Sequence, residues 1–169
     1  MKLNIGAGEA WSFAPPPWIN IDIRPSVQPD VVADILDLPF ADQSVAAVYA
    51  GHVLEHLERD EVTAAACEIK RVLMSGARLL VAGPDTERSD RMFAEGLITA
   101  ERHRSNGCHG DPGNPCVHHW ACTPGEIIRS LEAAGFVEVA EIPITQTPAE
   151  FPVFDRGSLD QFAVAARRP

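Results

Sequence analysis

The residues best suited to bind a ligand stand at the ends of predicted strands. Gly6, Ala7 and Gly8 form a glycine-rich turn after the strand expected at residues 2–6, and such a turn lets a ligand approach the backbone closely. Asp22 stands near the end of the next expected strand, where its carboxylate can accept hydrogen bonds from both hydroxyls of a ribose. The structural alternatives are a simple tight turn and a surface acid on a strand end.

An acidic turn and a histidine follow two further predicted strands. Asp34 opens a proline-fixed apolar turn at residues 34–40, where its carboxylate could hold the amino group of an adenine while Leu36 packs on the ring. The alternative is a loop acid beside a satellite hydrophobic cluster. His52 comes directly after residues 45–50, which are apolar on both faces and therefore predicted to form a central strand.

Several side chains could act as a general base and take a proton from an alcohol or amine. They are His52, Glu55, Asp85, His118 and His119. We take His52, Asp85 and His119 as the catalytic candidates. His56 stands four residues after His52 and can share its helix face. The alternative roles are structural: a capped helical turn around His56, or a loop histidine that packs on Trp120.

Cysteine and histidine are concentrated in one further segment. Its members are Cys108, His109, Cys116, His118, His119 and Cys122. These residue types suit zinc, but the segment has no CxxC pair and its spacing matches no familiar zinc finger. We expect unpaired thiols beside histidines that serve substrate recognition and assign no metal, with zinc and a disulfide left open as alternatives.

Composition narrows the classes of function. The chain has 169 residues, 46% of them hydrophobic, which suffices for one domain with its own core. Its 14 basic and 24 acidic residues give a net charge of −10, which argues against binding duplex nucleic acid or anionic lipid. We see no signal-peptide pattern and no membrane-length apolar run. A cytoplasmic protein with reduced cysteines, Cys67 included, is therefore expected.

Strands alternate with helices, which predicts an α/β fold with a mostly parallel sheet. The expected strands are residues 2–6, 19–23, 30–34, 45–50, 78–82, 136–144 and 159–166, the last two forming a hairpin-like pair at one edge. One amphipathic helix is expected at 58–73, and a capping box at Thr123 opens another that stops at Gly135. Within the single domain 1–169, the segment 86–120 is expected to be a lid or substrate loop, helical at first over 88–100.

The first two crossovers, residues 9–17 and 24–29, are too short and too rich in proline for helices. The side chains expected on one face of the nearby strands are Leu3, Ile5, Ile19, Ile21 and Ile23, and those expected on the other are Lys2, Asn4 and Asn20. Both clear helices should therefore cover the apolar face and leave the other face bare. A homodimer through this bare face is one option.

In their order, these motifs resemble the class I S-adenosylmethionine-dependent methyltransferases, and among them the group with a short catalytic core. The segments that carry the resemblance are LNIGAGE at 3–9, NIDI at 20–23, ADILDLPFADQSVAAVYAGHVLEHL at 33–57, IKRVLMSGARLLVAGPD at 69–85 and WACTPGEIIRSLEAAGF at 120–136. Each motif is loose, but their order and spacing are specific and cover most of the chain except 86–119. The resemblance implies a Rossmann-like, doubly wound sheet of seven strands with the last strand antiparallel.

The resemblance also implies S-adenosylmethionine as the cofactor and gives roles to particular residues. Gly6, Ala7 and Gly8 would line the methionine end, Asp22 would bind the ribose, Ile23, Asp34, Ile35 and Leu36 would address the adenine, and His52 and Val53 would lie under the sulfonium. The chain departs from the family where Ala10 replaces the usual third glycine and where the helix after the first strand is missing.

The expected function is methyl transfer to a small-molecule or sugar-like acceptor by in-line displacement. Much of the rate of such a reaction comes from holding the acceptor about 3–3.5 Å from the reacting carbon. The segment 86–119 would select the acceptor. The alternative is a degenerate, non-catalytic relative that senses the cofactor or binds a partner.

Overall fold

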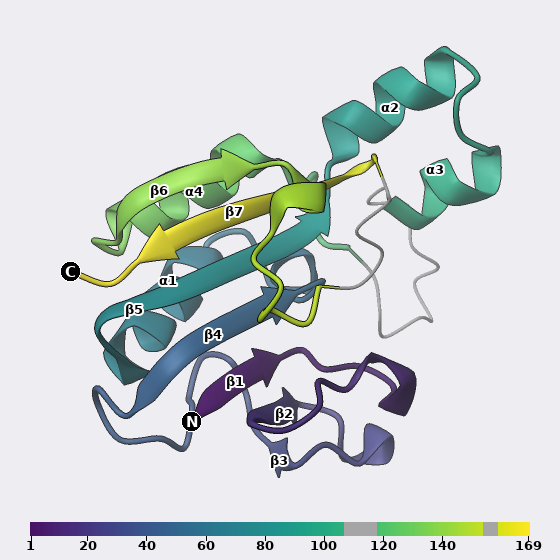
Figure 1. The fold of residues 1–169 in the computed structure, drawn as a ribbon. Helices are drawn as coiled ribbons and strands as arrows, with labels where there is room; N and C mark the ends of the chain where they lie inside the picture. Colours follow the sequence, from purple (N-terminus) through teal and green to yellow (C-terminus); the bar gives the residue numbers. More distant parts are fainter. Residues whose placement is uncertain (107–117, 154–158) are drawn as a thin grey trace.

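A computed structural model describes residues 1–106, 118–153 and 159–169 of the chain. Its strands are β1 (Lys2–Ile5), β2 (Trp18–Asp22), β3 (Val31–Val32), β4 (Val45–Gly51), β5 (Leu73–Pro84), β6 (Val137–Ile142) and β7 (Gln161–Arg167). They form one sheet in the order β3-β2-β1-β4-β5-β7-β6 (Figure 1). The strands from β1 to β5 pair in parallel, and β7 runs antiparallel to both β5 and β6. The predicted seven-stranded α/β fold is confirmed.

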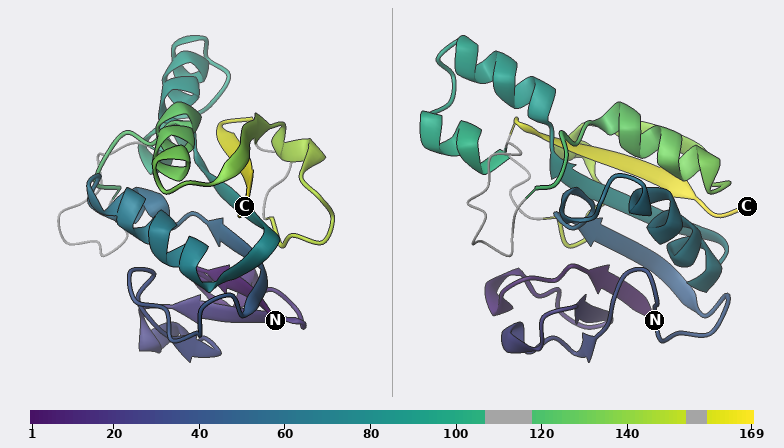
Figure 2. Two further views of the ribbon diagram at one scale, coloured as in Figure 1. Left: turned by 90° about the vertical axis from the view of Figure 1, so that its left-hand side faces the viewer. Right: turned by 180° about the vertical axis from the view of Figure 1, so that it is seen from behind.

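Two amphipathic helices cover one face of this sheet. Helix α1 (Glu61–Val72) and helix α4 (Pro124–Ala133) pack beside each other behind the strands, as Figure 2 shows from two sides. The stripe of α1 that is buried consists of Val62, Ala65, Ala66, Ile69 and Val72. These side chains join Leu3, Ile5 and Ile21 of the sheet in the larger hydrophobic core. The helices therefore pack on the sheet face that was predicted to be apolar.

Helix α4 begins and ends where the sequence predicts. The Thr123 hydroxyl accepts a hydrogen bond from the Glu126 backbone N–H, and Pro124 takes the first helical position. Gly135, at φ 81°, follows the end of the helix in the left-handed region that glycine adopts readily. The Glu126 carboxylate pairs with Arg59 of the turn before α1, so this side chain also ties the two helices together.

The first crossovers contain only 3₁₀ turns, at Ala10–Ser12 and Pro25–Val27. This confirms the prediction that helices are missing there. In the described part of the chain, no helix is long and apolar enough to span a membrane.

The prediction of a bare sheet face is wrong. Asn4 and Asn20 are buried, because the Asn4 amide donates to the Asn20 side-chain oxygen over 2.9 Å and Asn20 also bonds the backbone of Ala14 in the first crossover. Ile23 lies on the outside and is 61% exposed, because β2 ends at Asp22.

Further along the same face, a second hydrophobic cluster covers the sheet. Ile144 and Phe151, from the segment between β6 and β7, lie over Tyr49 of β4 and Leu80 of β5. Figure 1 shows this segment crossing the face opposite the two helices. The chain itself therefore covers the face proposed for a homodimer. The reason for expecting a homodimer through this face no longer applies.

The start of the expected lid is a pair of short helices. Helix α2 (Thr86–Ala94) and helix α3 (Ala100–Asn106) pack on each other and project beyond the carboxyl end of β5 (Figures 1 and 2). Asp160, just before β7, holds α3 by accepting hydrogen bonds from Arg102 at 2.6 and 2.9 Å and from Asn106 at 2.6 Å. The helix expected over 88–100 is α2, which ends at Ala94, before Gly96 at φ 71°, and α3 begins where the expected helix would end.

Candidate active site

The glycine-rich turn after β1 is joined to the end of β2. Ala7 donates its backbone N–H to the Ile21 carbonyl over 2.8 Å, and Gly8 donates to the Asp22 carboxylate over 2.9 Å. Gly6 and Gly8 adopt φ values of 69° and 67°, which glycine reaches without strain. Two predicted binding elements, the turn and the acid, are therefore parts of one site at the carboxyl ends of neighbouring parallel strands.

The Asp22 carboxylate is buried and fully hydrogen-bonded. Besides Gly8, it binds Arg24 three times: the backbone N–H at 3.0 Å, Nε at 3.0 Å and Nη2 at 3.2 Å. Burial raises the pKa of Asp22, but the bonds from Arg24 and Gly8 outweigh it, so that the pKa lies below its ordinary value. Since a carboxylate offers about four acceptor positions, a ribose must displace the Arg24 guanidinium to bind here.

Gly6 also contacts the turn that follows β4. A Cβ atom built on Gly6 would lie 2.5 Å from the Val53 Cβ atom, so only glycine lets the two turns approach this closely. The adjacent residue, His52, donates its backbone N–H to the Ala82 carbonyl of β5 over 2.9 Å. The structure therefore brings Gly6, Val53 and His52 to one edge of the sheet, as the sequence predicts for the reacting end of the site.

His52 lies beside a buried acid. It adopts φ 52°, and its Nδ1 lies 3.3 Å from Glu55 Oε1; the histidine side chain is 39% exposed and the Glu55 side chain only 1%. Burial lowers the pKa of His52, but the neighbouring Glu55 carboxylate outweighs this effect and the pKa is raised. Burial likewise raises the pKa of Glu55, while His52 and His56 bring it below its ordinary value. An acid–histidine pair of this kind can orient an imidazole and hold a proton.

The predicted adenine turn is held in place by helix α1. The Asp34 carboxylate accepts a hydrogen bond from the Leu36 backbone N–H over 2.9 Å, and Ile35 is buried beneath it. Glu68 of α1 accepts from the Leu38 N–H over 2.8 Å. The turn is thus rigid and leaves Leu36 partly exposed, as a surface for a ring would require.

The other two catalytic candidates have structural partners. The Asp85 carboxylate caps helix α2 by accepting the Arg88 N–H over 3.0 Å, and it also pairs with Arg88 Nε at 3.2 Å. His119 donates its backbone N–H to the Glu55 carbonyl over 2.9 Å, while its Nδ1 lies 2.8 Å from Glu58. Of the three candidates, His52 is the one whose ring lies beside a buried acid.

Two features of the site have no local sequence signal. The first is Arg24, whose guanidinium lies on the ribose acid. The second is the approach of Glu55, His56 and His118, whose candidate ligand atoms all lie within 4.8 Å of one another. Burial lowers the pKa of His118 and so favours its neutral imidazole. The adjacency of Glu55 and His56 was visible in the sequence, but their meeting with His118 depends on the fold.

Part of the Cys/His segment lies outside the described residues, namely Cys108, His109 and Cys116. Within the described chain, Cys122 is buried and Cys67 is an exposed free thiol. The zinc and disulfide alternatives for this segment therefore stay predictions from the sequence.

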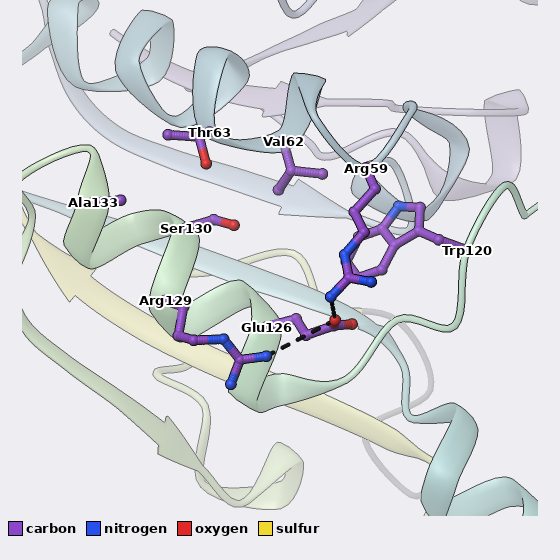
Figure 3. Close-up of a pocket in the computed structure, with 8 residues that line it drawn as sticks. All are labelled: Arg59, Val62, Thr63, Trp120, Glu126, Arg129, Ser130 and Ala133. Atoms are coloured by element: carbon purple, nitrogen blue, oxygen red, sulfur yellow. Dashed lines mark hydrogen bonds and ion pairs between the residues drawn. The ribbon is translucent and has the colours of Figure 1, made fainter.

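Two cavities on the described surface lie away from the glycine turn. One of about 270 Å³ opens between α1 and α4, where the Arg59–Glu126 pair crosses it beside Trp120 (Figure 3). Another, of about 550 Å³, runs beside α2 and is lined in part by Asp85, Arg88 and Glu141. Asp85 is the only predicted site residue among their linings.

Comparisons with known proteins concern the sequence and fold of the chain rather than its single site residues. A family model described as "Methyltransferase domain" matches residues 17–81, a range that includes Asp22, Asp34 and His52 but not the glycine turn. No curated protein sequence matches the chain. Among solved structures, a SAM-dependent methyltransferase of Thermotoga maritima, described as a possible histamine N-methyltransferase, aligns with a TM-score of 0.68 at 16% identity. The alignment covers 99% of this chain and 82% of that one.

Two archaeal structures are similarly related. A SAM-dependent methyltransferase of Archaeoglobus fulgidus aligns with a TM-score of 0.65 at 14% identity, over 98% of this chain and 85% of that one. A SAM-dependent methyltransferase of Methanosarcina mazei aligns with a TM-score of 0.64 at 18% identity, over 99% and 91%. The family model covers residues 17–81, and the solved structures show that the chain has the fold of SAM-dependent methyltransferases.

Proposed function

We propose that this domain transfers the methyl group of S-adenosylmethionine to an oxygen or nitrogen atom of a small-molecule or sugar-like acceptor, by in-line displacement. The observation that carries the proposal is the junction at the sheet edge: Gly6 contacts Val53 while Gly8 binds Asp22. This junction would align the ribose end of the cofactor with a reacting end beside His52, and alignment supplies much of the rate of such a displacement.

His52 is the proposed proton acceptor. Its partly exposed ring is accessible to an acceptor molecule, and Glu55 lies 3.3 Å behind it. The net charge of −10 supports a small acceptor, because a nucleic acid would need a basic surface. The helices α2 and α3, which project beyond the sheet edge, are placed to contribute to the choice of acceptor.

Transfer of a labelled methyl group to small hydroxyl- and amine-containing compounds tests this proposal. His52→Asn should lower the single-turnover rate by about 10²-fold or more, since it removes the general base, while cofactor affinity changes little. His103→Asn is the matched control, because His103 pairs with Asp90 on the α2–α3 helices. Labelling of RNA or protein in preference to small molecules would contradict the proposed acceptor class.

A non-catalytic binding module is the second candidate, and one observation favours it. The acceptor positions of Asp22 are occupied by Gly8 and Arg24, which is the arrangement expected if the ribose no longer binds. Failure of S-adenosylhomocysteine to bind at millimolar concentration would favour this module over the enzyme.

A further inference from the structure

We infer that Glu55, His56 and His118 form a binding site for a divalent transition-metal ion of the zinc or iron(II) class. Each offers one ligand atom, and the three atoms lie within 4.8 Å of one another. Two imidazoles and one carboxylate are a ligand set that binds such ions with positions left open for water or a substrate oxygen. The site shares Glu55 with the proposed base His52 and takes His118 from the Cys/His segment, but none of its three ligands is a cysteine.

Two buried atoms in this cluster lack hydrogen-bond partners. Glu55 is 1% exposed, and neither its Oε1 nor His118 Nδ1 has a hydrogen-bond partner among the residues that the structure describes. His52 approaches Oε1 at 3.3 Å, but without the geometry of a hydrogen bond. Leaving a carboxylate oxygen and an imidazole nitrogen unpaired in the interior is costly. One cation bound between them would satisfy both atoms.

The two segments that supply the ligands are fixed to each other. His119 donates its backbone N–H to the Glu55 carbonyl over 2.9 Å, and Trp120 Nε1 donates to the Leu54 carbonyl over 3.3 Å. The rings of His56 and His118 meet edge to face, with their centroids 5.0 Å apart. These contacts hold residues distant in sequence in one arrangement before a ligand arrives, which lowers the entropic cost of binding.

The Glu55 carboxylate packs against Gly83 of β5, where an added Cβ atom would meet Oε2 at an ordinary contact distance of 3.6 Å. Because His56 and His118 are only partly buried, an ion can reach the cluster from solvent.

Metal content and calorimetry on the full chain, purified without a histidine tag and stripped with a chelator, test this inference. Zn²⁺ should bind at about one equivalent per chain and raise the melting temperature by mass action. His118→Ala and Glu55→Gln should each weaken zinc binding by about tenfold or more, since loss even of outer-shell partners costs about 10–100-fold. His103→Ala, a histidine outside the cluster, should bind zinc as the wild type does.

Substitution with Co²⁺ identifies the donor atoms. Nitrogen and oxygen ligands should give visible d–d absorption without thiolate-to-metal charge transfer. The inference is overturned if the wild type binds only substoichiometric zinc, if both substitutions leave the affinity unchanged, or if thiolate charge transfer shows that cysteines hold the ion. His118→Ala keeps the test informative if the buried Glu55→Gln substitution prevents folding, because His118 is the less buried of the two.

Discussion

Asp22 carries the proposed contact with the cofactor, and Arg24 competes for the same carboxylate. The guanidinium takes two of its acceptor positions, while backbone N–H groups of Gly8 and Arg24 take the others. Arg24 is partly exposed, with 34% of its side chain accessible, so it can leave the carboxylate at modest cost. Cofactor binding would then replace the hydrogen bonds from the Arg24 guanidinium to Asp22 by hydrogen bonds from the ribose hydroxyls.

Arg24→Ala should therefore tighten the binding of S-adenosylhomocysteine, by up to about fivefold, because a partly exposed ion pair contributes about 0.2–1 kcal/mol. Calorimetric titration at one ionic strength measures the change. Arg59→Ala is the control, since Arg59 is exposed and pairs with Glu126 on the α4 side. Weaker binding in Arg24→Ala would mean that the guanidinium contacts the cofactor instead of competing with it.

Gly6 is required for two reasons that can be separated. Its φ of 69° disfavours any side chain, and a Cβ atom would also strike Val53. Gly6→Ala should cost about 1–2 kcal/mol for the left-handed backbone, plus about 1–3 kcal/mol for the displacement of Val53. Urea unfolding measures the sum.

Gly76→Ala is the matched control. Gly76 has φ 75° but no atom within 4 Å of a built Cβ, so that only the backbone term applies. Equal losses of stability in the two variants would show that the close approach of the two turns is not required by the fold.

At the scale of the elements, helix α1 holds the predicted adenine turn through a charged network. Glu68 accepts hydrogen bonds from Leu38 N–H at 2.8 Å and from Arg71 at 2.6 and 2.8 Å. Arg71 in turn donates to the carbonyls of Leu38 and Phe40. The bond from Arg71 is the main cause that lowers the pKa of Glu68, against the effect of burial.

Because the folded pKa of Glu68 is lowered, its contribution to stability is present above the ordinary value of 4.5 and is lost as the pH falls through the folded pKa. Glu68→Gln should lower the free energy of unfolding near neutral pH by about 1 kcal/mol, since a charged hydrogen bond is replaced by a neutral one. The difference should shrink well below pH 4.5. Urea unfolding at both pH values, with the exposed Glu132→Gln as control, checks this. A difference independent of pH would contradict it.

The sequence was sufficient to predict elements whose side chains repeat with a clear period. Alternation located β1 and β2, the apolar stripe located α1, and Thr123 marked the start of α4. The helix expected over 88–100 was predicted too long, because α2 ends at Ala94 and the chain turns at Gly96. The proline-rich crossovers were correctly predicted to lack helices, because proline removes backbone donors.

At the scale of the whole molecule, the features that the sequence did not predict correctly all depend on contacts between distant segments. The polarity of Asn4 and Asn20 predicted a solvent-facing surface. In the interior, however, Asn4 donates to Asn20, which in turn donates to Ala14 and Asp30, and such pairing between segments cannot be seen in the pattern of one strand. The segment that covers the rest of that face lies between β6 and β7, far along the chain. The approach of His118 to Glu55 and His56 likewise depends on the tertiary fold, so that sequence spacing could not show it.

The central claim is that the carboxyl edge of this sheet binds S-adenosylmethionine through Asp22 and the glycine turn. Calorimetric titration with S-adenosylhomocysteine tests it most directly, with Asp22→Asn beside the exposed Asp60→Asn as the matched control. The account predicts saturable binding by the wild type and by Asp60→Asn, and a loss of about 1–3 kcal/mol in Asp22→Asn, because the ribose hydroxyls lose a charged partner. Equal affinities in all three proteins would contradict it, because the ribose would then lie elsewhere.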